Sequence, residues 1–343
     1  MSRPPDPAVL IVGAGVAGLS CARALADAGR PAVVLERARG VGGRCATRRL
    51  GEQPVDFGVA FLHGRDPAFL AALAEVPATA LPGWPLAARG AGRPCQPEAF
   101  TPGELRLAFA EGVSALPKHL ARGLEVRLRA RATALAPEEG TLRVALDGAG
   151  EARAPTVVLA TAPEQAAALL ATVPGELPAV ASARALLDLS RSRACLALLA
   201  RYPAATPPPP WHVCFPEGSR VLQVAIHDSA KRPGAPALVL VLQGHTAWSR
   251  AHLEDPGWPA ALLEEAGRCL GPWAARPEHQ EAHRWLHARS DRSAELSGPV
   301  LLALPGGARL GLCGDRFAPG GGVEAAWRSG RALAARILEE ERR

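Results

Sequence analysis

The stretch that most constrains the fold of this chain is Val9 to Gly18, with the sequence VLIVGAGVAG. A short apolar run leads directly into a glycine-rich turn, and the alanine- and leucine-rich segment Leu19 to Ala28 then has the composition of a helix. Strand, glycine turn and helix in this order are typical of the phosphate-binding start of a parallel α/β sheet. The sequence therefore predicts a dinucleotide site in the first domain.

Each glycine of the turn has its own physical role. Gly13 permits the tight bend, Gly15 lets a pyrophosphate approach the backbone, and Gly18 lets the helix pack close to the strand. The free N–H groups and the partial positive charge of the helix N-terminus favour the phosphates. A second apolar run, Pro31 to Leu35, ends at Glu36. An acidic side chain at that place would reach the adenosine ribose.

The following segment distinguishes between dinucleotides. Residues 36–47 have the sequence ERARGVGGRCAT. Gly42 and Gly43 allow a second close approach of the backbone, and Arg44 offers a planar cationic group that suits phosphate. This stretch resembles the flavin amine oxidase superfamily, in which a Gly-Gly-Arg segment contacts the FAD phosphates. An NAD dehydrogenase has no need of this loop, so the resemblance implies FAD.

Charge and cysteine content limit the other classes of function. The formal net charge is +6, from 39 Lys and Arg against 33 Asp and Glu, and only two of the cations are lysines. The cations are scattered with little aromatic interleaving, so we expect no nucleic-acid partner.

The seven cysteines include no Cys-x-x-Cys pair, which favours a cytoplasmic protein without a disulfide framework. No stretch reaches the roughly 18 apolar residues of a membrane span, and the polar N-terminus does not resemble a signal peptide.

The segment Val55 to Gly64, VDFGVAFLHG, follows the second glycine loop. Similar Asp-x-Gly segments of amine oxidases and renalases run beside the isoalloxazine ring, which implies flavin contacts for Asp56, Phe57 and Gly58. The His-Gly ending is closer to the amine oxidases and suggests that His63 lines the substrate side of the flavin. The alternative is a buried strand with an incidental histidine.

The pattern of elements predicts two domains. Residues 141–146 and 156–161 alternate as strands joined by glycine turns, and the resemblance places Ala132 beside the adenine. The middle of the chain has a different pattern of elements from the first part. It contains further strand-like runs at 194–200, 221–226 and 237–243 and a helix at 259–270. We expect a discontinuous Rossmann-like α/β domain that binds FAD, with an inserted α+β substrate domain. The predicted bounds are 1–75, 104–170 and 295–343 for the FAD domain, and 76–103 and 171–294 for the substrate domain.

Three segments of the middle region resemble renalases in particular. They are DSAKRPG at 228–234, HTAWSR at 245–250 and AHRWLHA at 282–288. The substrate residues that we predict are His63, His245, Arg284 and Trp285, with His227 as a weaker candidate. Each of these residues has an alternative reading as a core or rim residue of the domain.

His279, His283 and His287 have two interpretations. Spacing of four residues would place them on one face of a helix, as in a metal site. The same residues fit a strand, in which His283, Trp285 and His287 point to one side. The family resemblance favours the strand, and we expect no metal.

The C-terminal region completes the predicted FAD site. The run at 309–315, RLGLCGD, ends in Gly314 and Asp315, and in this superfamily such a carboxylate holds a ribityl hydroxyl. A glycine loop then leads to a helix that runs to Glu340. A helix N-terminus directed at the N1–C2=O edge of the flavin would stabilise the negative charge that reduction creates. Glu324 also suits the dipole of the first turn.

Together the segments give the following set of predicted cofactor contacts: Gly13, Ala14, Gly15, Val16, Ala17, Gly18, Glu36, Arg37, Gly43, Arg44, Asp56, Phe57, Gly58, Ala132, Gly314, Asp315, Gly322, Val323 and Glu324. We expect FAD to be non-covalent, because Cys313 precedes the Gly-Asp pair and suits a core position.

The resemblance identifies the chain as a renalase-like FAD-dependent oxidoreductase. It implies hydride transfer from a small reduced donor, such as an isomeric dihydronicotinamide dinucleotide, to flavin, with O2 as acceptor and H2O2 as product. The flavin carries the chemistry, so no side chain is predicted as a catalytic acid or base. One alternative is an amine oxidase with an aromatic cage, although Tyr202 is the only tyrosine. Another is a non-catalytic or sensing FAD-binding protein. The sequence leaves the donor and the oligomeric state open.

Overall fold

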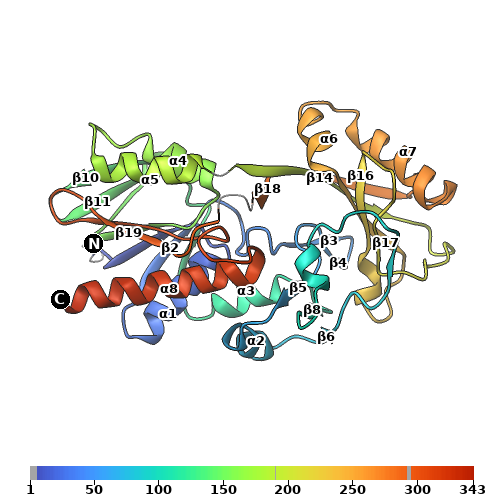
Figure 1. The fold of residues 1–343 in the computed structure, drawn as a ribbon, viewed down its shortest axis with the longest axis horizontal. Coiled ribbons are helices and arrows are strands. Elements are labelled where there is room, and N and C mark those ends of the chain that lie inside the picture. The colour runs from blue at the N-terminus through green and yellow to red at the C-terminus, as the bar shows by residue number, and fades with distance from the viewer. Residues whose placement is uncertain (1–5, 190, 292–294) are drawn as a thin grey trace. The chain divides into compact units, whose positions relative to one another are not determined.

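The computed structural model describes residues 6–189, 191–291 and 295–343 (Figure 1). The chain forms two compact units, and both are discontinuous in sequence. The first unit contains Met1–Gly43, Leu116–Ser192 and Ser290–Arg343, and the second contains Arg44–Ala115 and Arg193–Arg289.

A mostly parallel sheet of six strands forms the centre of the first unit. Its order is β19 (Val300–Ala303), β20 (Arg309–Leu312), β13 (Thr156–Leu159), β1 (Val9–Val12), β2 (Ala32–Glu36) and β9 (Glu125–Leu128). Only β19 runs antiparallel to its neighbour. All four residues of β1 are buried, as expected for a central strand that is covered on both faces. This arrangement is the predicted Rossmann-like α/β fold.

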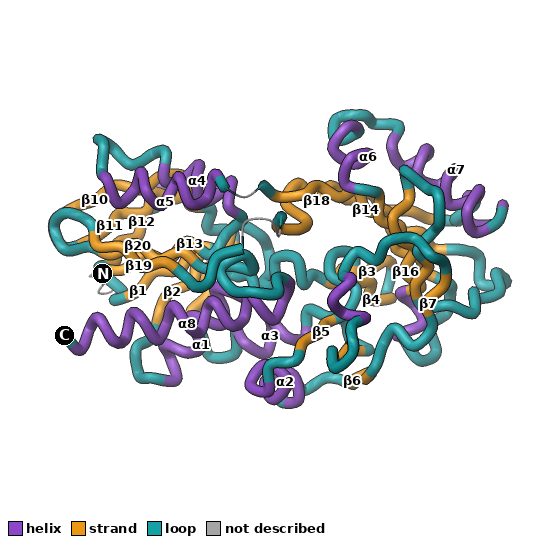
Figure 2. The backbone as a smooth tube through the Cα atoms, viewed as in Figure 1, coloured by secondary structure: helices purple, strands orange, loops and turns teal. Residues whose placement is uncertain are grey.

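Helices cover both faces of this sheet (Figure 2). On one face lie α1 (Val16–Asp27) and α8 (Gly322–Arg342), which pack so closely that a Cβ at Gly330 would overlap the carbonyl oxygen of Ala17. On the other face, α4 (Pro163–Leu170) and α5 (Pro178–Asp188) share a core with the sheet. The remaining elements of this unit are α3 (Ala115–Leu120), η2 (Asp147–Ala149) and an antiparallel sheet of β10 (Ala132–Glu138), β11 (Thr141–Leu146) and β12 (Glu151–Ala154).

The second unit is built on another six-stranded sheet. Its order is β18 (His279–Ser290), β14 (Ser192–Arg201), β17 (Val239–Gly244), β16 (Leu222–His227), β15 (Val213–Cys214) and β7 (Ala88–Arg89). Trp258 and Leu262 of α7 (Trp258–Leu270) pack on one side of it. The smaller elements are β3 (Thr47–Leu50), β4 (Gln53–Asp56), β5 (Leu62–Gly64), α2 (Pro67–Ala74), β6 (Ala80–Pro82), η1 (Pro97–Phe100), β8 (Leu105–Phe109), η3 (Asp228–Lys231), α6 (Thr246–Ala251) and η4 (Pro272–Ala275).

The structure divides the chain at different residues from those that the sequence suggested. Residues 44–75 and 104–115 belong to the second unit, where Val55 and Ala108 share a core with Val241 of β17. Residues 171–192 belong to the first unit, because Val180, Ala183 and Leu187 of α5 complete the core beside α4. The expected strands and helices are present with small shifts of their ends, whereas α5 and α6 were not predicted.

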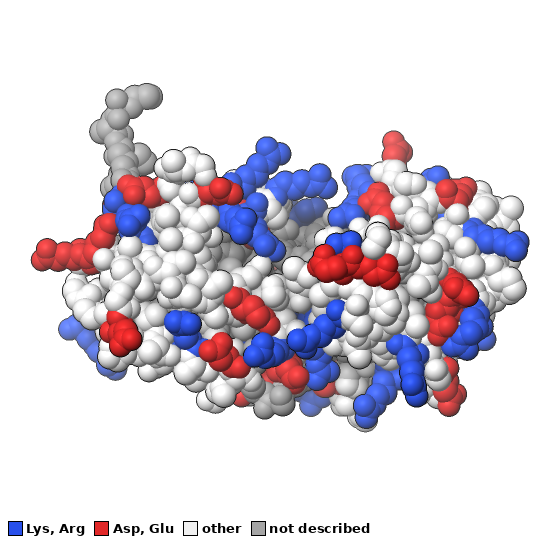
Figure 3. All heavy atoms as spheres, turned by 90° about the horizontal axis from the view of Figure 1, so that it is seen from above, with Lys and Arg blue, Asp and Glu red and all other residues white. Residues whose placement is uncertain are grey.

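The distribution of surface charge and the character of the helices both bear on the class of protein. Figure 3 shows cationic and anionic side chains interspersed over the visible face. Within the described ranges, no helix combines the length and the apolar character that crossing a membrane requires.

Candidate cofactor and substrate sites

The turn between β1 and α1 contains glycines of two kinds. Gly13 has φ of 109°, and a Cβ there would lie 2.8 Å from the oxygen of Ala160. A Cβ at Gly18 would overlap the oxygen of Gly13. A Cβ at Gly15, in contrast, would meet no described atom within 4 Å. The fold therefore requires Gly13 and Gly18, while the open space beside Gly15 fits a ligand that approaches the backbone.

The N-terminus of α1 offers backbone donors at this turn. Gly15 is the N-cap residue, no side chain caps the helix, and the first turn holds no acidic residue. The first N–H groups of a helix have no partner within the helix and attract anions. Val16 and Ala17 supply such groups, so the geometry fits the diphosphate of a dinucleotide.

Glu36 lies at the end of β2, next to the turn. Its Oε2 accepts a hydrogen bond from the Ala14 nitrogen and its Oε1 accepts one from the Ala38 nitrogen, each at 2.8 Å. These bonds hold the carboxylate beside the glycine turn, where a ribose hydroxyl could reach it. Arg37 follows as an exposed residue.

The second glycine loop lies against the first. The nitrogen of Gly42 donates to the oxygen of Ala14 at 2.8 Å, and Gly15 and Gly42 form a parallel β-bridge. Gly42 and Gly43 have φ of 120° and 55°, which only glycine adopts without strain. Two glycine-rich loops of the chain thus meet, as a binding site for the FAD diphosphate requires.

The C-terminal part of the first unit brings a carboxylate and a second helix N-terminus. Asp315 follows β20, and its Oδ1 accepts a hydrogen bond from Ser290 at 2.9 Å. Gly320, Gly321 and Gly322 all have positive φ, and α8 begins at Gly322 without a side-chain cap. The helix therefore starts where the sequence predicted, with Val323 and Glu324 in its first turn. Ala132 lies at a register irregularity between β10 and β11.

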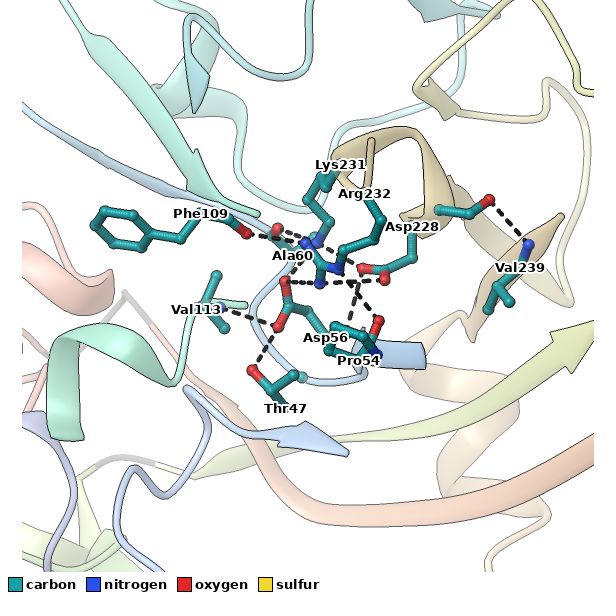
Figure 4. Close-up of polar contacts among 12 residues, drawn as sticks. Thr47, Pro54, Asp56, Ala60, Phe109, Val113, Asp228, Lys231, Arg232 and Val239 are labelled. Atoms are coloured by element: carbon teal, nitrogen blue, oxygen red, sulfur yellow. Dashed lines mark hydrogen bonds and ion pairs between the residues drawn. The ribbon is translucent and has the colours of Figure 1, made fainter. Parts of the chain in front are cut away.

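In the second unit, Asp56 belongs to a buried ion-pair network that we define as Asp56, Asp228, Lys231 and Arg232 (Figure 4). Lys231 Nζ lies 2.6 Å from Asp56 Oδ2 and 2.5 Å from Asp228 Oδ1. Arg232 Nη2 lies 3.0 Å from Asp56 Oδ2 and 3.3 Å from Asp228 Oδ2. The network joins β4 to η3 and balances two anions with two cations.

The two carboxyl groups of the network differ in acidity. Burial acts to raise the pKa of Asp56, but Lys231 and Arg232 outweigh it and the pKa is lowered. The pKa of Asp228 is raised, because burial outweighs the attraction of Lys231 and Asp56 adds repulsion. Asp56 is therefore the more acidic of the two carboxyl groups.

The Asp56 side chain has its hydrogen-bond partners inside the second unit. Its Oδ1 accepts hydrogen bonds from Thr47 at 2.6 Å and from the Val113 nitrogen at 3.0 Å, while its Oδ2 faces the two cations. The side chain is fully buried. Its carboxylate is thus engaged within the protein, and the flavin contact of this residue stays a prediction.

Side chains distant in sequence fix the backbone that follows Asp56. The oxygen of Phe57 accepts from Trp285 Nε1 at 3.0 Å, and that of Gly58 accepts from Gln243 Nε2 at 2.9 Å. The oxygen of Ala60 accepts from Lys231 Nζ at 2.9 Å. A Cβ at Gly58 would overlap the oxygen of Arg44 and lie 3.0 Å from Trp285. The missing side chain thus allows close packing inside this unit, and the flavin contact of Gly58 stays a prediction.

Residues 279–290 form strand β18, as predicted, and not a helix. Glu281, His283, Trp285 and His287 are partly buried along one face, while Arg284 and Leu286 alternate with them and are exposed. Among the described residues, no group of His, Cys, Asp or Glu is arranged to hold a metal ion. The alternation also separates Arg284 from Trp285, so these two predicted substrate residues do not share a face.

An aromatic and cationic surface surrounds Trp285; we call Arg48, Phe57, Glu281, His283 and Trp285 the β18 platform. Trp285 stacks on Phe57 at a centroid distance of 5.1 Å, and His283 packs edge-on against both rings. The Arg48 guanidinium lies 4.7 Å from the Phe57 centroid, and its Nη1 donates to Glu281 at 3.0 Å. Burial and Arg48 lower the pKa of His283 to about 4, so the imidazole is neutral at pH 7.

His63 is a buried residue of β5 with an acidic partner. Its Nδ1 lies 2.6 Å from Glu104 Oε1, and Arg65 Nε lies 2.9 Å from Glu104 Oε2. Within the described chain, His63 Nε2 has no hydrogen-bond partner. Burial acts to raise the pKa of Glu104, but the hydrogen bonds from His63 and Arg65 lower it.

The other predicted substrate residues have separate surroundings. His245 is the N-cap residue of α6, and burial lowers its pKa. His227 ends β16 inside the core, with Nδ1 3.3 Å from the oxygen of Trp211. Arg284 is exposed, and its closest anion is Glu254 at 4.0 Å.

Sequence reasoning missed several residues of the second unit. Arg48 lies shortly after the Gly-Gly-Arg segment but was given no role, Glu104 belongs to no motif, and Gln243 lies within an apolar strand. Arg289 donates to Gln223 and Gln243 at 3.0 and 2.9 Å. Lys231 lies in a segment that resembles renalases, and the sequence analysis noted that segment only for this resemblance. The rarity of lysine in this chain was the one signal that could have marked it.

The sheet, the paired glycine loops and the N-termini of α1 and α8 define an α/β fold of the dinucleotide-binding kind. Residues 11–76 match the NAD(P)-binding Rossmann-like domain, and residues 95–338 match the flavin-containing amine oxidoreductase family. The chain belongs to the flavin-containing amine oxidoreductase family, and it is a flavin-dependent oxidoreductase.

Relatives agree with this assignment. Polyamine oxidase 2 of Arabidopsis thaliana is 43% identical over 59 residues, and polyamine oxidase 4 of Oryza sativa subsp. japonica is 41% identical over 58 residues. Each match spans 17% of this chain and only 12% of the relative.

Solved structures share the fold along the whole chain. Cyclohexylamine oxidase from Brevibacterium oxydans has a TM-score of 0.75 at 16% identity, over 99% of this chain and 100% of that one. A putrescine oxidase variant from a redesign of cofactor binding has a TM-score of 0.74 at 16% identity, over 97% and 99%.

Proposed function

We propose that this protein is an oxidase that uses non-covalent FAD to oxidise a small reduced donor. The donor gives a hydride to the flavin, and O2 then takes up two electrons and two protons to form H2O2. Bound FAD supplies the hydride-accepting ring, and the protein supplies position and electrostatics. The buried Cys313, whose pKa burial raises to about 12, supports a flavin without a thioether link.

The first unit supports the cofactor part of this proposal. The backbone at Gly15 and Gly43 would cradle the diphosphate, Glu36 would bind the ribose, and Asp315 would bind the ribityl chain. The N-terminus of α8 would stabilise negative charge on the reduced ring. We also propose a reducing compartment such as the cytoplasm, because all seven cysteines are unpaired.

The β18 platform is the observation that carries the proposed donor class. Trp285 is partly exposed and stacks on the buried Phe57, so it offers an aromatic face, while Arg48 and neutral His283 offer donors and acceptors. This combination suits a planar ring with an anionic substituent better than a flexible cationic amine. We therefore propose a renalase-like donor, an isomeric dihydronicotinamide nucleotide.

An amine donor is the second candidate, and the His63–Glu104 pair favours it. A carboxylate that is 5% exposed beside an imidazole with an unused nitrogen suits an ammonium group. Relatives that carry the names of polyamine, putrescine and cyclohexylamine oxidases support the same candidate.

Anaerobic stopped-flow reduction of the FAD-loaded protein tests the proposal. The flavin absorbance is followed after mixing with dihydronicotinamide isomers, ordinary NADH and NADPH, and a panel of primary amines and polyamines. Fast bleaching by the isomers alone supports the renalase-like donor, and bleaching by amines alone supports the second candidate. A protein that binds FAD but is bleached by no donor is the non-catalytic alternative.

A further inference from the structure

We infer that Arg48 is the anion-recognition residue of the donor site, and that it selects a planar donor bearing a phosphate over a cationic amine. This inference rests on the proposed function and adds a residue to which the sequence analysis gave no role.

Three contacts fix the guanidinium of Arg48. Nη1 donates to Glu281 at 3.0 Å, Nη2 lies 3.5 Å from His283 Nδ1, and the group lies 4.7 Å from the centroid of the Phe57 ring. A guanidinium has five N–H donors in a rigid fork. Within the described chain, Arg48 Nε has no acceptor, and the side chain is 27% exposed. A pre-oriented cation with unused donors is thus accessible to a ligand.

The charges around Arg48 favour an anionic ligand. Glu281 is the carboxylate of the platform, and it is shared with His279, whose Nε2 lies 3.8 Å from its Oε1. His283 is neutral at pH 7 and contributes no charge. A cationic amine would have to displace Arg48 from Glu281, whereas a phosphate could bind the guanidinium directly.

The aromatic residues of the β18 platform explain why we expect the donor to contain a planar ring. Trp285 is held by stacking on Phe57 at 26° between planes and by its hydrogen bond to the Phe57 oxygen. A ring fixed in this way loses little conformational freedom when a planar ligand packs against it. Arg48 and Trp285 both contact Phe57, so they lie close enough to contact one mononucleotide.

The test compares two donors that differ only in the phosphate: a reduced nicotinamide mononucleotide and the reduced riboside of the same isomer. For Arg48→Gln we expect the apparent Kd of the mononucleotide in stopped-flow reduction to rise roughly tenfold, which corresponds to about 1.4 kcal/mol. The Kd of the riboside and the limiting reduction rate stay unchanged. Arg48→Lys keeps the charge without the fork and should show a smaller loss.

Arg49→Gln is the matched control, because Arg49 is the next residue of β3, is exposed, and donates to the oxygen of Glu52. Equal losses for both donors in Arg48→Gln, or an equal loss of mononucleotide affinity in Arg49→Gln, would overturn the inference. Calorimetric titration of the FAD-loaded protein with the oxidised mononucleotide and riboside gives a readout without turnover. If no dihydronicotinamide reduces the flavin, the proposed function fails. An Arg48-dependent preference for the phosphate in calorimetry would still uphold anion recognition, and its absence would reject that as well.

Discussion

The amino group of Lys231 lies 2.6 Å from a carboxylate oxygen of Asp56, 175 residues away in the chain, and both side chains are completely buried. Lys231 also donates to the oxygen of Ala60 and lies 4.9 Å from the centre of the Trp84 ring. A buried charge is tolerated only when it is paired and hydrogen-bonded. The pair therefore fixes where the segment after β4 lies within the second unit.

Removing one partner of this pair should destabilise the protein strongly. In Lys231→Met, Asp56 and Asp228 would share only Arg232, and a broken buried pair costs about 3–5 kcal/mol. We expect this loss in the free energy of unfolding of the second unit, measured by urea denaturation. Lys118→Met changes the other lysine, which is exposed, and should have little effect. Equal stability of the two variants would contradict the prediction.

Alanine substitutions should separate the ligand-binding glycine from the structural one. Gly15 has φ of −75° and open space for a Cβ, so Gly15→Ala should fold normally but lose FAD, because the methyl group occupies the place of the phosphate. In Gly18→Ala the Cβ overlaps the oxygen of Gly13, so the protein itself should lose stability. The measurements are flavin content and the melting temperature without added FAD. A Gly15→Ala protein that retains full FAD affinity would contradict the cradle.

The elements that the sequence predicted well are those whose signal is local. The apolar run of β1, the glycine turn and α1 depend on neighbouring residues, and alternation along β18 is visible within ten residues. His283, Trp285 and His287 share a face because successive side chains of a strand point to opposite sides. The same rule places Arg284 on the opposite face from Trp285.

The features that the sequence did not reveal depend on contacts between distant residues. In the sequence, Asp228 and Lys231 have the pattern of an ordinary charged loop. In the structure, η3 places both residues beside Asp56. Gly58 suggested a cofactor contact, yet Trp285 fills the space beside it. The division into units depends on such contacts too, since residues 44–75 join the second unit through a core that Val55 shares with Val241.

The stability of the second unit should fall in mild acid because of His283. Its pKa is lowered to about 4 from an ordinary 6.5, so the unfolded chain binds a proton there in a range where the folded protein does not. Stability is then complete above about pH 6.5 and decreases towards pH 4, by an amount on the order of 1 kcal/mol at about pH 5.

In His283→Gln this part of the pH dependence should disappear. The free energy of unfolding at pH 7 and pH 5 measures it, with His279→Gln as the control because His279 is exposed. If His283→Gln loses as much stability between these two pH values as the wild type does, the assignment to His283 is wrong.

The stability that the Glu104 carboxylate contributes through its pairing with His63 should also decrease in acid. The pKa of Glu104 is lowered from 4.5, so the stability that its carboxylate contributes is present above that value and is lost as the pH falls through the lowered pKa. Glu104→Gln should therefore cost about 1–3 kcal/mol near neutral pH, because His63 and Arg65 lose their charged acceptor. The difference from the wild type should shrink in acid. Urea denaturation from pH 7 to pH 3 measures both effects, and Glu254→Gln, at a side chain that is 93% exposed, provides the reference. A constant difference across this range would show that Glu104 acts through its shape and not through its charge.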